Sequence, residues 1–402
     1  MLDNNEKEQI INNNLIYIKS ITNSDNGQVK INIEIDNKTE EIMMTFSKNV
    51  IKYLTLDRCD AAVMGFIIMA IRTNRDIKSD IPISESLYYR ITQDLIPGLC
   101  LEPDVYSPHI SCPIIQDLKP SETQKIVATG ISCGVDSLYS VMLHTNNVCE
   151  SFNLNSLVFL NAGAHHFGTS VQSRSLYEGR LELAKQFCKE VNLDLIEIST
   201  NLPDLIEMNQ HGYEHPEHHT FCMLSCILMI QAGVLKYYYS GGYPYSEFDC
   251  HLKSGLMTDC AHFDLLTLAC ASNQTLQFYS TGGGLSRFDK VKAMKGYIPA
   301  EKFMNVCVAD INNCGHCFKC KRTLLDLDAA GIIDNFNTVF DIEEYRKTRR
   351  SRILEGYRSA VRGDDGMLLE LMPFFKSEIS PTQRFWQKIR TILGRVYSFI
   401  FR

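Results

Sequence analysis

The segment 126–143, IVATGISCGVDSLYSVML, decides the fold. It opens with a short apolar run, continues with the small and polar residues SCGVDS at 132–137, and then places Leu138, Val141 and Met142 at helical spacing. An apolar run of this length is typical of a buried strand, and the spacing that follows is typical of a helix. The segment therefore predicts a strand, a tight loop and a helix.

This arrangement is typical of an anion site, because loop N–H groups and the positive end of the following helix attract negative charge. Ser132 and Ser137 add hydroxyl donors. Asp136 would be repelled by a bare phosphate, so we expect it to hold a Mg²⁺ ion that bridges phosphate oxygens. The Walker pattern is absent because the loop has no lysine. An ordinary strand-to-helix turn is the alternative. The expected nucleotide-binding residues are Ser132, Cys133, Gly134, Val135, Asp136 and Ser137.

The loop resembles the S-G-G-x-D-S signature of the PP-loop ATP pyrophosphatases, which cleave ATP to AMP and pyrophosphate. Cys133 stands where that family usually has its first glycine. If the position requires a positive φ, a cysteine is less favourable there than a glycine. The resemblance implies an α/β fold of the PP-loop type that uses ATP and Mg²⁺.

Composition indicates a globular protein of the cytoplasm. The 402 residues are 45% hydrophobic and 22% charged, and the net charge of −7 disfavours a general affinity for nucleic acid. The first ten residues, MLDNNEKEQI, lack the basic and apolar parts of a signal peptide. Fifteen cysteines, an odd number, favour reduced thiols over a disulfide framework.

Residues 1–120 contain no nucleotide motif and are predicted to form an α+β accessory domain. Residues 28–35 alternate as a strand does, and 41–46 can pair with them across a polar turn. Residues 59–71 are apolar nearly all round, which favours a buried helix that is too short to cross a bilayer. Residues 84–95 predict a second helix. A linker follows at 117–123.

From residue 124 strands and helices alternate, which predicts a parallel sheet with helices on both faces. We expect this domain to span 121–335 and a helical extension to occupy 336–402. After the strand of the opening segment, the expected strands are 156–160, 194–198, 236–240 and 276–279, and the expected helices are 173–191 and 221–235.

Ligands in such sheets bind at the carboxyl ends of the strands. Glycine-bearing loops follow three strands, at 161–166, 241–247 and 281–290. In PP-loop enzymes a distal basic residue helps to hold the ATP phosphates, and the resemblance assigns that role to Arg287 and Lys290 by position. The alternative is that both are exposed charges at the start of a helix.

The segment 211–220, HGYEHPEHHT, concentrates four histidines and two glutamates. Such a cluster can bind a metal. We favour a mobile polar loop over the active site that ends with Thr220 as a helix N-cap, because its glycine and proline oppose a fixed i, i+4 spacing of ligands. His219 is the candidate catalytic residue of this loop.

Four cysteines in the segment CVADINNCGHCFKC have the spacing C-x6-C-x2-C-x2-C. This pattern predicts a closed, structural zinc site without a position for water, and its ligands are Cys307, Cys314, Cys317 and Cys320. An iron–sulfur cluster and unligated thiols are the alternatives, although the Cys-Pro ending of a bacterial ferredoxin run is absent.

The order of the loop and the cysteines resembles that of the 7-cyano-7-deazaguanine synthases, from about Lys125 to Leu327. Those enzymes have the S-G-G-x-D-S loop at the start of the domain and a C-x7/8-C-x2-C-x2-C zinc site near its end. This chain departs at Cys133, in its shorter first cysteine spacing and in its extensions at both ends. The resemblance implies a related enzyme, and the substrate is not carried over.

The last segment, 381–402, places apolar residues on one helical face and arginine and lysine near the other. A basic amphipathic helix of this kind docks on a partner, packs in a homo-oligomer or lies on a membrane surface. Packing on protein is the favoured interpretation.

These features together predict an ATP-dependent ligase that forms AMP and pyrophosphate. It would adenylate a carboxylate of a small-molecule or protein acceptor, with a 7-deazaguanine acid as one candidate, for attack by a nitrogen nucleophile. Asp136, Arg287, Lys290 and His219 are the expected catalytic residues, and ATP, Mg²⁺ and Zn²⁺ are the expected cofactors. A sulfurtransferase using Cys133, Cys222 or Cys250 and a sugar amidotransferase are the enzymatic alternatives. A non-catalytic nucleotide-binding scaffold is the alternative from another class.

Overall fold

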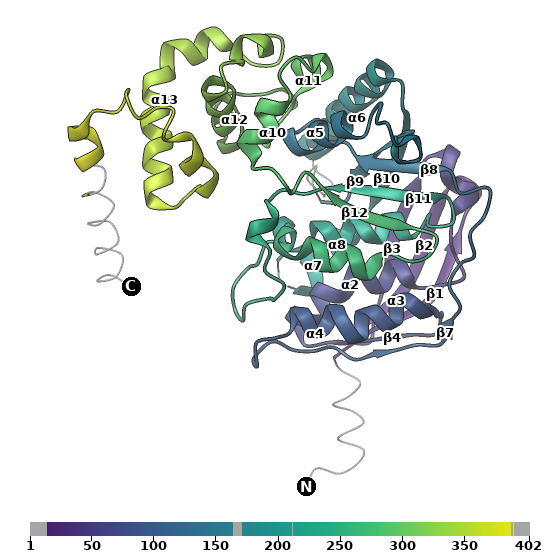
Figure 1. Ribbon diagram of the computed structural model, residues 1–402. Helices are drawn as coiled ribbons and strands as arrows, with labels where there is room; N and C mark the ends of the chain where they lie inside the picture. The colour runs from purple at the N-terminus through teal and green to yellow at the C-terminus, as the bar shows by residue number, and fades with distance from the viewer. Residues whose placement is uncertain (1–13, 164–170, 211, 387–388, 390–402) are drawn as a thin grey trace. The chain divides into compact units, whose positions relative to one another are not determined.

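The computed structural model describes residues 14–163, 171–210, 212–386 and 389 (Figure 1). The chain divides into two compact units that are each assembled from two segments. The larger unit contains 1–131 and 143–284, and the smaller unit contains 132–142 and 285–402. Each unit has a hydrophobic core of its own.

A mixed sheet forms the centre of the larger unit, and a two-stranded sheet lies beside it. The strand order of the large sheet is β12-β11-β8-β9-β10-β3-β2-β1-β4-β6, and the small sheet pairs β5 with β7. The strands are β1 (Leu15–Asn23), β2 (Gln28–Ile35), β3 (Lys38–Phe46), β4 (Asp76–Ser79), β5 (Ile83–Ser84), β6 (Ile110–Ser111), β7 (Ile114–Ile115), β8 (Ile126–Gly130), β9 (Ser156–Asn161), β10 (Asp194–Thr200), β11 (Val234–Ser240) and β12 (Gln277–Thr281).

The half of the sheet from β12 to β10 is entirely parallel. Its strands β9 to β12 confirm the four strands predicted at 156–160, 194–198, 236–240 and 276–279. The chain runs from β8 through β9 to β10 on one side and then returns to place β11 on the other side of β8. The strand order therefore reverses at β8, and the carboxyl ends of β8 and β11 flank the position where open sheets of this kind bind ligands.

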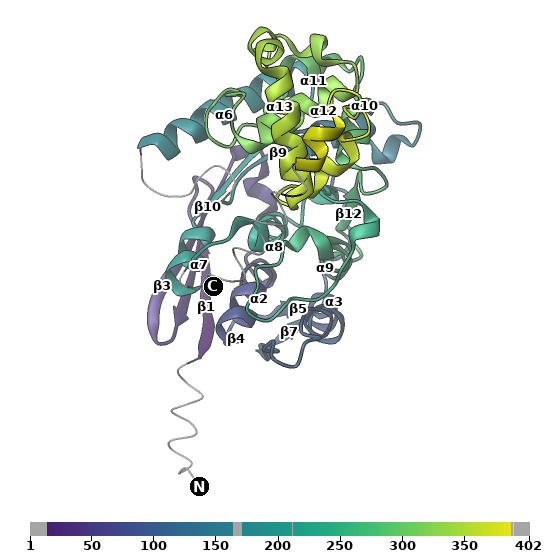
Figure 2. The ribbon, with the colours of Figure 1, turned by 90° about the vertical axis from the view of Figure 1, so that its left-hand side faces the viewer.

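The other half of the sheet comes from the N-terminal region. Strand β3 pairs antiparallel with β10, and β2 and β1 continue antiparallel from β3 (Figure 2). The β2–β3 hairpin confirms the prediction from the alternating pattern, and both residues of its turn, Asp36 and Asn37, have a positive φ, of 50° and 68°. The sheet is therefore mostly parallel rather than wholly parallel, and the region predicted as an accessory domain contributes strands to it.

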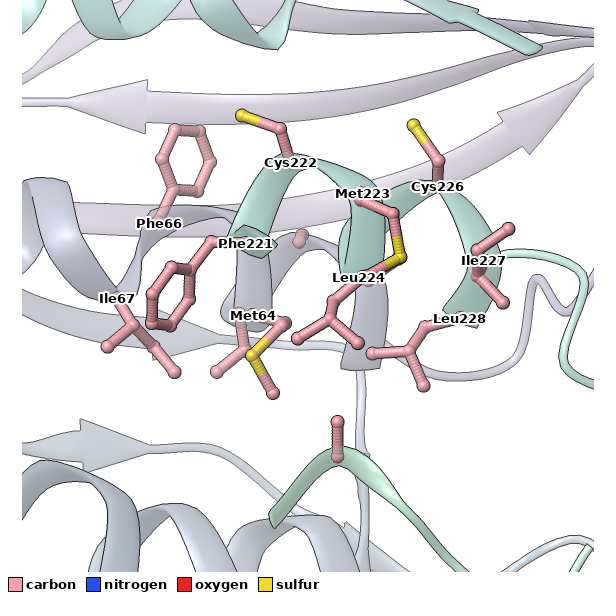
Figure 3. Packing of buried hydrophobic residues seen from close by; sticks show 14 of the residues in the cluster. Met64, Phe66, Ile67, Phe221, Cys222, Met223, Leu224, Cys226, Ile227 and Leu228 are labelled. Atoms are coloured by element: carbon pink, nitrogen blue, oxygen red, sulfur yellow. The ribbon is translucent and has the colours of Figure 1, made fainter. Parts of the chain in front are cut away.

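Two largely buried helices form the core beneath the sheet. Helices α2 (Asp60–Thr73) and α8 (His215–Leu228) pack together, and Figure 3 shows their side chains, among them Ile67, Phe221 and Leu224. Gly65 permits this approach, because a Cβ atom there would lie 3.1 Å from the Ser225 hydroxyl oxygen. The prediction of a buried helix at 59–71 is confirmed.

The remaining helices of the larger unit complete its layers. Helix α6 contacts β9 and β10 on the side of the sheet opposite to α2 and α8 (Figure 1). The helices of this unit other than α2 and α8 are α3 (Glu85–Arg90), the π segment η2 (Ile91–Leu95), α4 (Ile96–Leu99), α6 (Val171–Val191), α7 (Leu202–Gln210) and α9 (Asp264–Ala271). Its 3₁₀ turns are η1 (Lys48–Tyr53), η3 (Glu150–Phe152), η4 (Tyr245–Glu247) and η5 (Cys260–Phe263).

The prediction for helix α8 was wrong at both ends. A helix was expected over 221–235, but α8 begins at His215 and ends at Leu228, and β11 already starts at Val234. Pro216 lies in the first turn of α8, where its missing N–H has no partner to lose. The proline therefore starts the helix instead of excluding it.

The smaller unit is helical. It contains α5 (Val135–Leu143) except for its last residue, α10 (Arg287–Ala293), α11 (Ile298–Phe303), α12 (Phe318–Ala329), α13 (Ile342–Arg362), and the 3₁₀ turns η6 (Ile333–Phe336) and η7 (Gly366–Leu371). Apolar residues of α10, α12, α13 and η7 form its core. Asp341 caps α13 by accepting a hydrogen bond from the Glu344 N–H, and Gly363 ends it with a φ of 84°.

Three sequence predictions fall partly outside the described residues. These are the N-terminal segment 1–13, the histidines at 165, 166 and 211, and most of the expected amphipathic helix at 381–402. Within the part of the chain that the structure describes, no helix is long and apolar enough to cross a membrane.

The junction between β3 and β10 gives a testable prediction. The Asn201 side chain accepts a hydrogen bond from the Met43 N–H (2.7 Å) and donates one to the Glu41 carbonyl oxygen (3.0 Å). Asn201→Ala removes both bonds at the point where the parallel and antiparallel halves meet. We expect a loss of about 1–3 kcal/mol in the free energy of unfolding, measured with urea. Asn209→Ala is the control, since that side chain donates a hydrogen bond to the Leu205 carbonyl of its own helix, and an equal loss in both variants would contradict the prediction.

Candidate functional site

The segment 132–137 forms a tight loop that is closed by its own serines. The Ser132 and Ser137 hydroxyl oxygens lie 3.2 Å apart, and the Ser137 hydroxyl donates to the Gly134 carbonyl oxygen (3.1 Å). The Ser132 hydroxyl oxygen accepts a hydrogen bond from the Gly134 N–H (3.3 Å). Helix α5 begins at Val135, so the loop leads into a helix N-terminus as the sequence predicts.

Cys133 adopts the left-handed backbone conformation that glycine prefers. Its φ is 57°, and its side chain is 1% exposed. Its carbonyl oxygen accepts a hydrogen bond from the Asn305 N–H (2.8 Å). The conformational cost anticipated for a cysteine at this position is therefore real, of about 1–2 kcal/mol, and burial of the side chain offsets part of it.

Asp136, in the first turn of α5, is paired with two cations. The Lys290 ammonium lies 2.8 Å from Asp136 Oδ1, and the Arg287 guanidinium lies 3.3 Å from Oδ2. Lys290 is 1% exposed, Arg287 10% and Asp136 26%. The structure thus brings three of the four predicted catalytic residues together, and their catalytic roles stay predictions.

Helix α10 explains why both cations reach Asp136. Arg287 and Lys290 are three positions apart, so they lie on one face of the helix. The Ser286 side chain caps α10 by accepting a hydrogen bond from the Asp289 N–H (3.2 Å). This cap fixes the start of the helix immediately before Arg287, and the alternative of two exposed charges is excluded by their burial.

Arg287 has a second acidic partner, Asp326 of α12. Arg287 Nε lies 3.5 Å from Asp326 Oδ2, and the guanidinium also donates to the Thr323 hydroxyl (3.1 Å). Asp326 is 1% exposed. Burial raises the pKa of Asp326 to about 7, against the opposing influence of Arg287 and Arg322. Sequence analysis missed Asp326, and the available signal was an acidic residue between Leu325 and Leu327, with Asp328 two positions later.

The four predicted zinc ligands converge in the smaller unit. The sulfur atoms of Cys307, Cys314, Cys317 and Cys320 all lie within 4.8 Å of one another. The sulfurs of Cys307 and Cys317 are 4.0 Å apart, close to the separation of about 3.8 Å that two thiolates have on one tetrahedral zinc ion. The four-cysteine cluster is therefore compatible with zinc binding.

Backbone N–H groups point at these sulfurs and favour the thiolate form. Cys307 accepts from the Asp310 N–H, Cys314 from two N–H groups, and Cys317 from the Cys320 N–H. Burial opposes ionisation of Cys317, but the N–H groups of Val308 and Cys320 prevail and lower its pKa to about 7. A thiolate is the form of cysteine that binds a metal ion, so these backbone N–H groups favour metal binding by the cluster.

Helix α13 supports the loop that carries Cys314. The Arg352 guanidinium donates to the carbonyl oxygen of Gly315 (2.6 Å), and Gly315 has a φ of 71°. Cys317 is the N-cap of α12, so the cluster also fixes the start of the helix that carries Asp326. The cysteines and the Arg287–Asp326 pair are thus joined through one helix.

His219, the fourth predicted catalytic residue, lies in the larger unit. It is inside α8, so the expected mobile loop ending in a Thr220 N-cap is wrong: Glu214 is the N-cap, and Thr220 lies in the helix interior. The expectation that proline and glycine prevent i, i+4 spacing is also wrong, because His215 and His219 stand one turn apart with ring centres separated by 5.4 Å.

The neighbours of His219 are Asp259 and Cys260, which sequence analysis missed. His219 Nε2 lies 3.3 Å from Asp259 Oδ1, and Cys260 is the next residue along the chain. Burial disfavours a charged His219 ring, but Cys260 and Asp259 outweigh burial and raise its pKa to about 10. No local pattern marks this group, because its members are 40 positions apart in the sequence.

No protein-family model, curated protein or solved structure that was compared with the chain matches it. Any functional proposal for this chain therefore rests on the residues and contacts described above.

The cysteine cluster gives a prediction of metal content. Cys314→Ser removes one of the four sulfurs, so we expect the purified protein to lose one equivalent of zinc per chain, measured by atomic spectrometry. Cys149→Ser is the control, because Cys149 is exposed and outside the cluster. A zinc content equal to that of the control would contradict a metal role for these cysteines.

Asp326 gives a prediction of pH dependence. Its pKa is raised from 3.8 to about 7 in the folded protein. Between about pH 4 and pH 7 the unfolded chain releases this proton while the folded protein retains it, so the free energy of unfolding falls as pH rises. Asp326→Asn removes that loss. We therefore expect its stability relative to the wild type, from urea unfolding, to be greater at pH 8 than at pH 5.

The control for this experiment is Asp364→Asn, which changes an exposed carboxylate in the same unit. Its stability relative to the wild type should be nearly independent of pH. If the Asp326→Asn difference were equally independent of pH, the raised pKa would be refuted.

Proposed function

We propose that the chain is a PP-loop ATP pyrophosphatase that acts as an AMP- and pyrophosphate-forming ligase. ATP binds at the 132–137 loop, a carboxylate oxygen of the second substrate attacks the α-phosphorus, and pyrophosphate leaves. A nitrogen nucleophile then displaces AMP from the acyl adenylate. The carboxylate is a small molecule, with a 7-deazaguanine acid as one candidate, or belongs to a protein.

The observation that carries the proposal is the convergence of Asp136, Arg287 and Lys290 beside the loop. Two cations and the N-terminus of α5 meet at Asp136, and Arg287 has the buried Asp326 as a second partner. These cations and N–H groups suit a polyphosphate, whose oxygens can share the cations with Asp136. Burial of Lys290 strengthens its electrostatic interaction with a bound phosphate.

The loop serines and the residues beside the loop have separate roles in this proposal. The Ser132 and Ser137 hydroxyls and the loop N–H groups orient the phosphates, and the closed serine network holds the donors in place beforehand. Arg287 and Lys290 stabilise the charge that builds up on the departing pyrophosphate. Asp326 and Thr323 of α12 orient the Arg287 guanidinium through an ion pair and a hydrogen bond.

The residues also fit a Mg²⁺ ion. Asp136 offers hard carboxylate oxygens and is partly exposed, and Mg²⁺ in nucleotide sites is commonly held by one or two carboxylates plus phosphate oxygens. The ion would supply neutralisation of phosphate charge. The zinc that the cysteine cluster suits would have a structural role, since four thiolates leave no position for a substrate.

A sulfurtransferase is less well supported. Such an enzyme needs an accessible, reactive thiol, but Cys133 and Cys222 are both buried, and burial raises the pKa of Cys222. Of the three candidate cysteines, Cys250 alone is partly exposed. The AMP-forming ligase requires no cysteine nucleophile.

The test is nucleotide chemistry with purified protein. We expect binding of Mg-ATP by calorimetry, and release of AMP and pyrophosphate when the protein is supplied with a panel of carboxylates that includes 7-carboxy-7-deazaguanine. Asp136→Asn keeps the size of the side chain and one oxygen, but it removes the charge that would hold Mg²⁺. We expect AMP formation and ATP–pyrophosphate exchange to fall at least about 100-fold in this variant.

Asp364→Asn is the matched control, because it neutralises an exposed aspartate of the same unit that pairs with Arg362, two positions earlier. Thermal unfolding of both variants separates loss of activity from loss of fold. Release of ADP and phosphate in place of AMP and pyrophosphate, or unchanged exchange in Asp136→Asn, would refute the proposal.

A further inference from the structure

Three side chains of types that can bind a metal meet in the larger unit, well separated in sequence from the four-cysteine cluster. They are His219 of α8, Asp259 and Cys260, the last at the start of η5. One ligand atom of each lies within 4.8 Å of the other two. Nothing in the proposed ligase chemistry requires this group.

We propose that His219, Asp259 and Cys260 bind a divalent transition-metal ion, with zinc as the best fit, and leave one coordination position open to water or a ligand. The donors are His219 Nε2, Asp259 Oδ1 and Cys260 Sγ. One nitrogen, one sulfur and one carboxylate oxygen suit zinc, whereas Mg²⁺ and Ca²⁺ take oxygen donors. Three protein ligands are typical of zinc sites that retain an exchangeable position.

The distances suit coordination better than a simple ion pair. His219 Nε2 and Asp259 Oδ1 are 3.3 Å apart. Two ligands at about 2.0–2.1 Å from a tetrahedral zinc ion are separated by about 3.3–3.4 Å. A charge-assisted hydrogen bond between the same two atoms would usually be about 2.7–2.9 Å long.

Each ligand is held by a second side chain or N–H group, as metal ligands in proteins usually are. The His219 Nδ1 atom lies 2.9 Å from the Tyr239 hydroxyl, which leaves Nε2 for the metal. The Tyr243 hydroxyl donates to the other carboxylate oxygen of Asp259 (3.2 Å). The Cys260 sulfur accepts a hydrogen bond from the Thr220 N–H (3.4 Å).

Burial distinguishes a metal site from a nucleophilic cysteine with a histidine base. Cys260 is 0% exposed, so its sulfur cannot reach a substrate carbonyl, although it can complete a coordination sphere. The His219 and Asp259 side chains are each 24% exposed. The accessible side of the group is therefore where the histidine and the carboxylate lie, and the open coordination position belongs there.

The position in the fold also favours a ligand site. Tyr239, which holds His219, is next to the last residue of β11, and Tyr243 follows in the loop after that strand. The carboxyl end of β11 borders the point where the strand order reverses. Open α/β sheets bind their ligands at this point.

The experiment is metal analysis of the full chain produced with added zinc. We expect two equivalents per chain in the wild type, one at each cluster, and one equivalent in each of His219→Gln, Asp259→Asn and Cys260→Ser. Cys226→Ser is the matched control, because Cys226 is also a fully buried thiol of the α8 region but belongs to neither cluster. It should retain two equivalents.

Folding is checked by circular dichroism, and Asp259→Asn is the most conservative variant. Its side-chain oxygen can still accept the hydrogen bond from the Ala261 N–H that caps η5. Replacement of zinc by cobalt gives a second readout: the three variants should lose the bands of a site with one thiolate and keep those of the four-thiolate site.

A single equivalent of metal in the wild type, or two equivalents retained by folded His219→Gln and Asp259→Asn proteins, would overturn the inference. Metal content is independent of ATP chemistry. Failure of the ligase proposal and failure of this inference are therefore distinguishable.

Discussion

The ion pairs of Asp136 are the constraint on which the smaller unit depends. That unit is built from a short segment, 132–142, and from 285–402, and Asp136 and Arg287 are 151 positions apart in the sequence. A buried ammonium such as that of Lys290 is stable only with an opposite charge nearby, since its desolvation costs several kcal/mol. Asp136 supplies that charge. The same contact that holds the loop segment in its unit therefore also sets the electrostatics of the proposed phosphate site.

A second long-range constraint shapes the larger unit. The pairing of β3 with β10 joins an antiparallel hairpin region to a parallel sheet, so that one core runs under both. Strand β10 is thereby no longer an edge, which removes a row of unpaired backbone groups from solvent. The strand order reverses at β8, which is the last strand before residues 132–137 along the chain.

Local patterns in the sequence predicted the elements better than their partners. The strand, loop and helix around residues 126–143, the β2–β3 hairpin and the convergence of the four cysteines all follow from short spacings. The pairing of β3 with β10 does not, because strand partners are chosen by packing over the whole chain. Pro216 was misjudged for a different reason: a proline is compatible with the first turn of a helix and incompatible with its interior. Asp326, Asp259 and Cys260 carry no motif, and only the tertiary structure brings them to Arg287 and His219.

The donor atoms at each of the three proposed sites favour a different ion or a different role for it. The Asp136 carboxylate is a hard donor that suits Mg²⁺ with phosphate oxygens, and among the described residues it belongs to neither of the groups that could hold a metal through histidine or cysteine. The four cysteine sulfurs suit zinc and leave it no open position, so an ion there can order α12 but cannot bind a substrate. The group of His219, Asp259 and Cys260 is the intermediate case, with one soft donor and one exposed side. If it binds zinc, the larger unit contains an ion with a coordination position open to a ligand, and the smaller unit contains a structural ion.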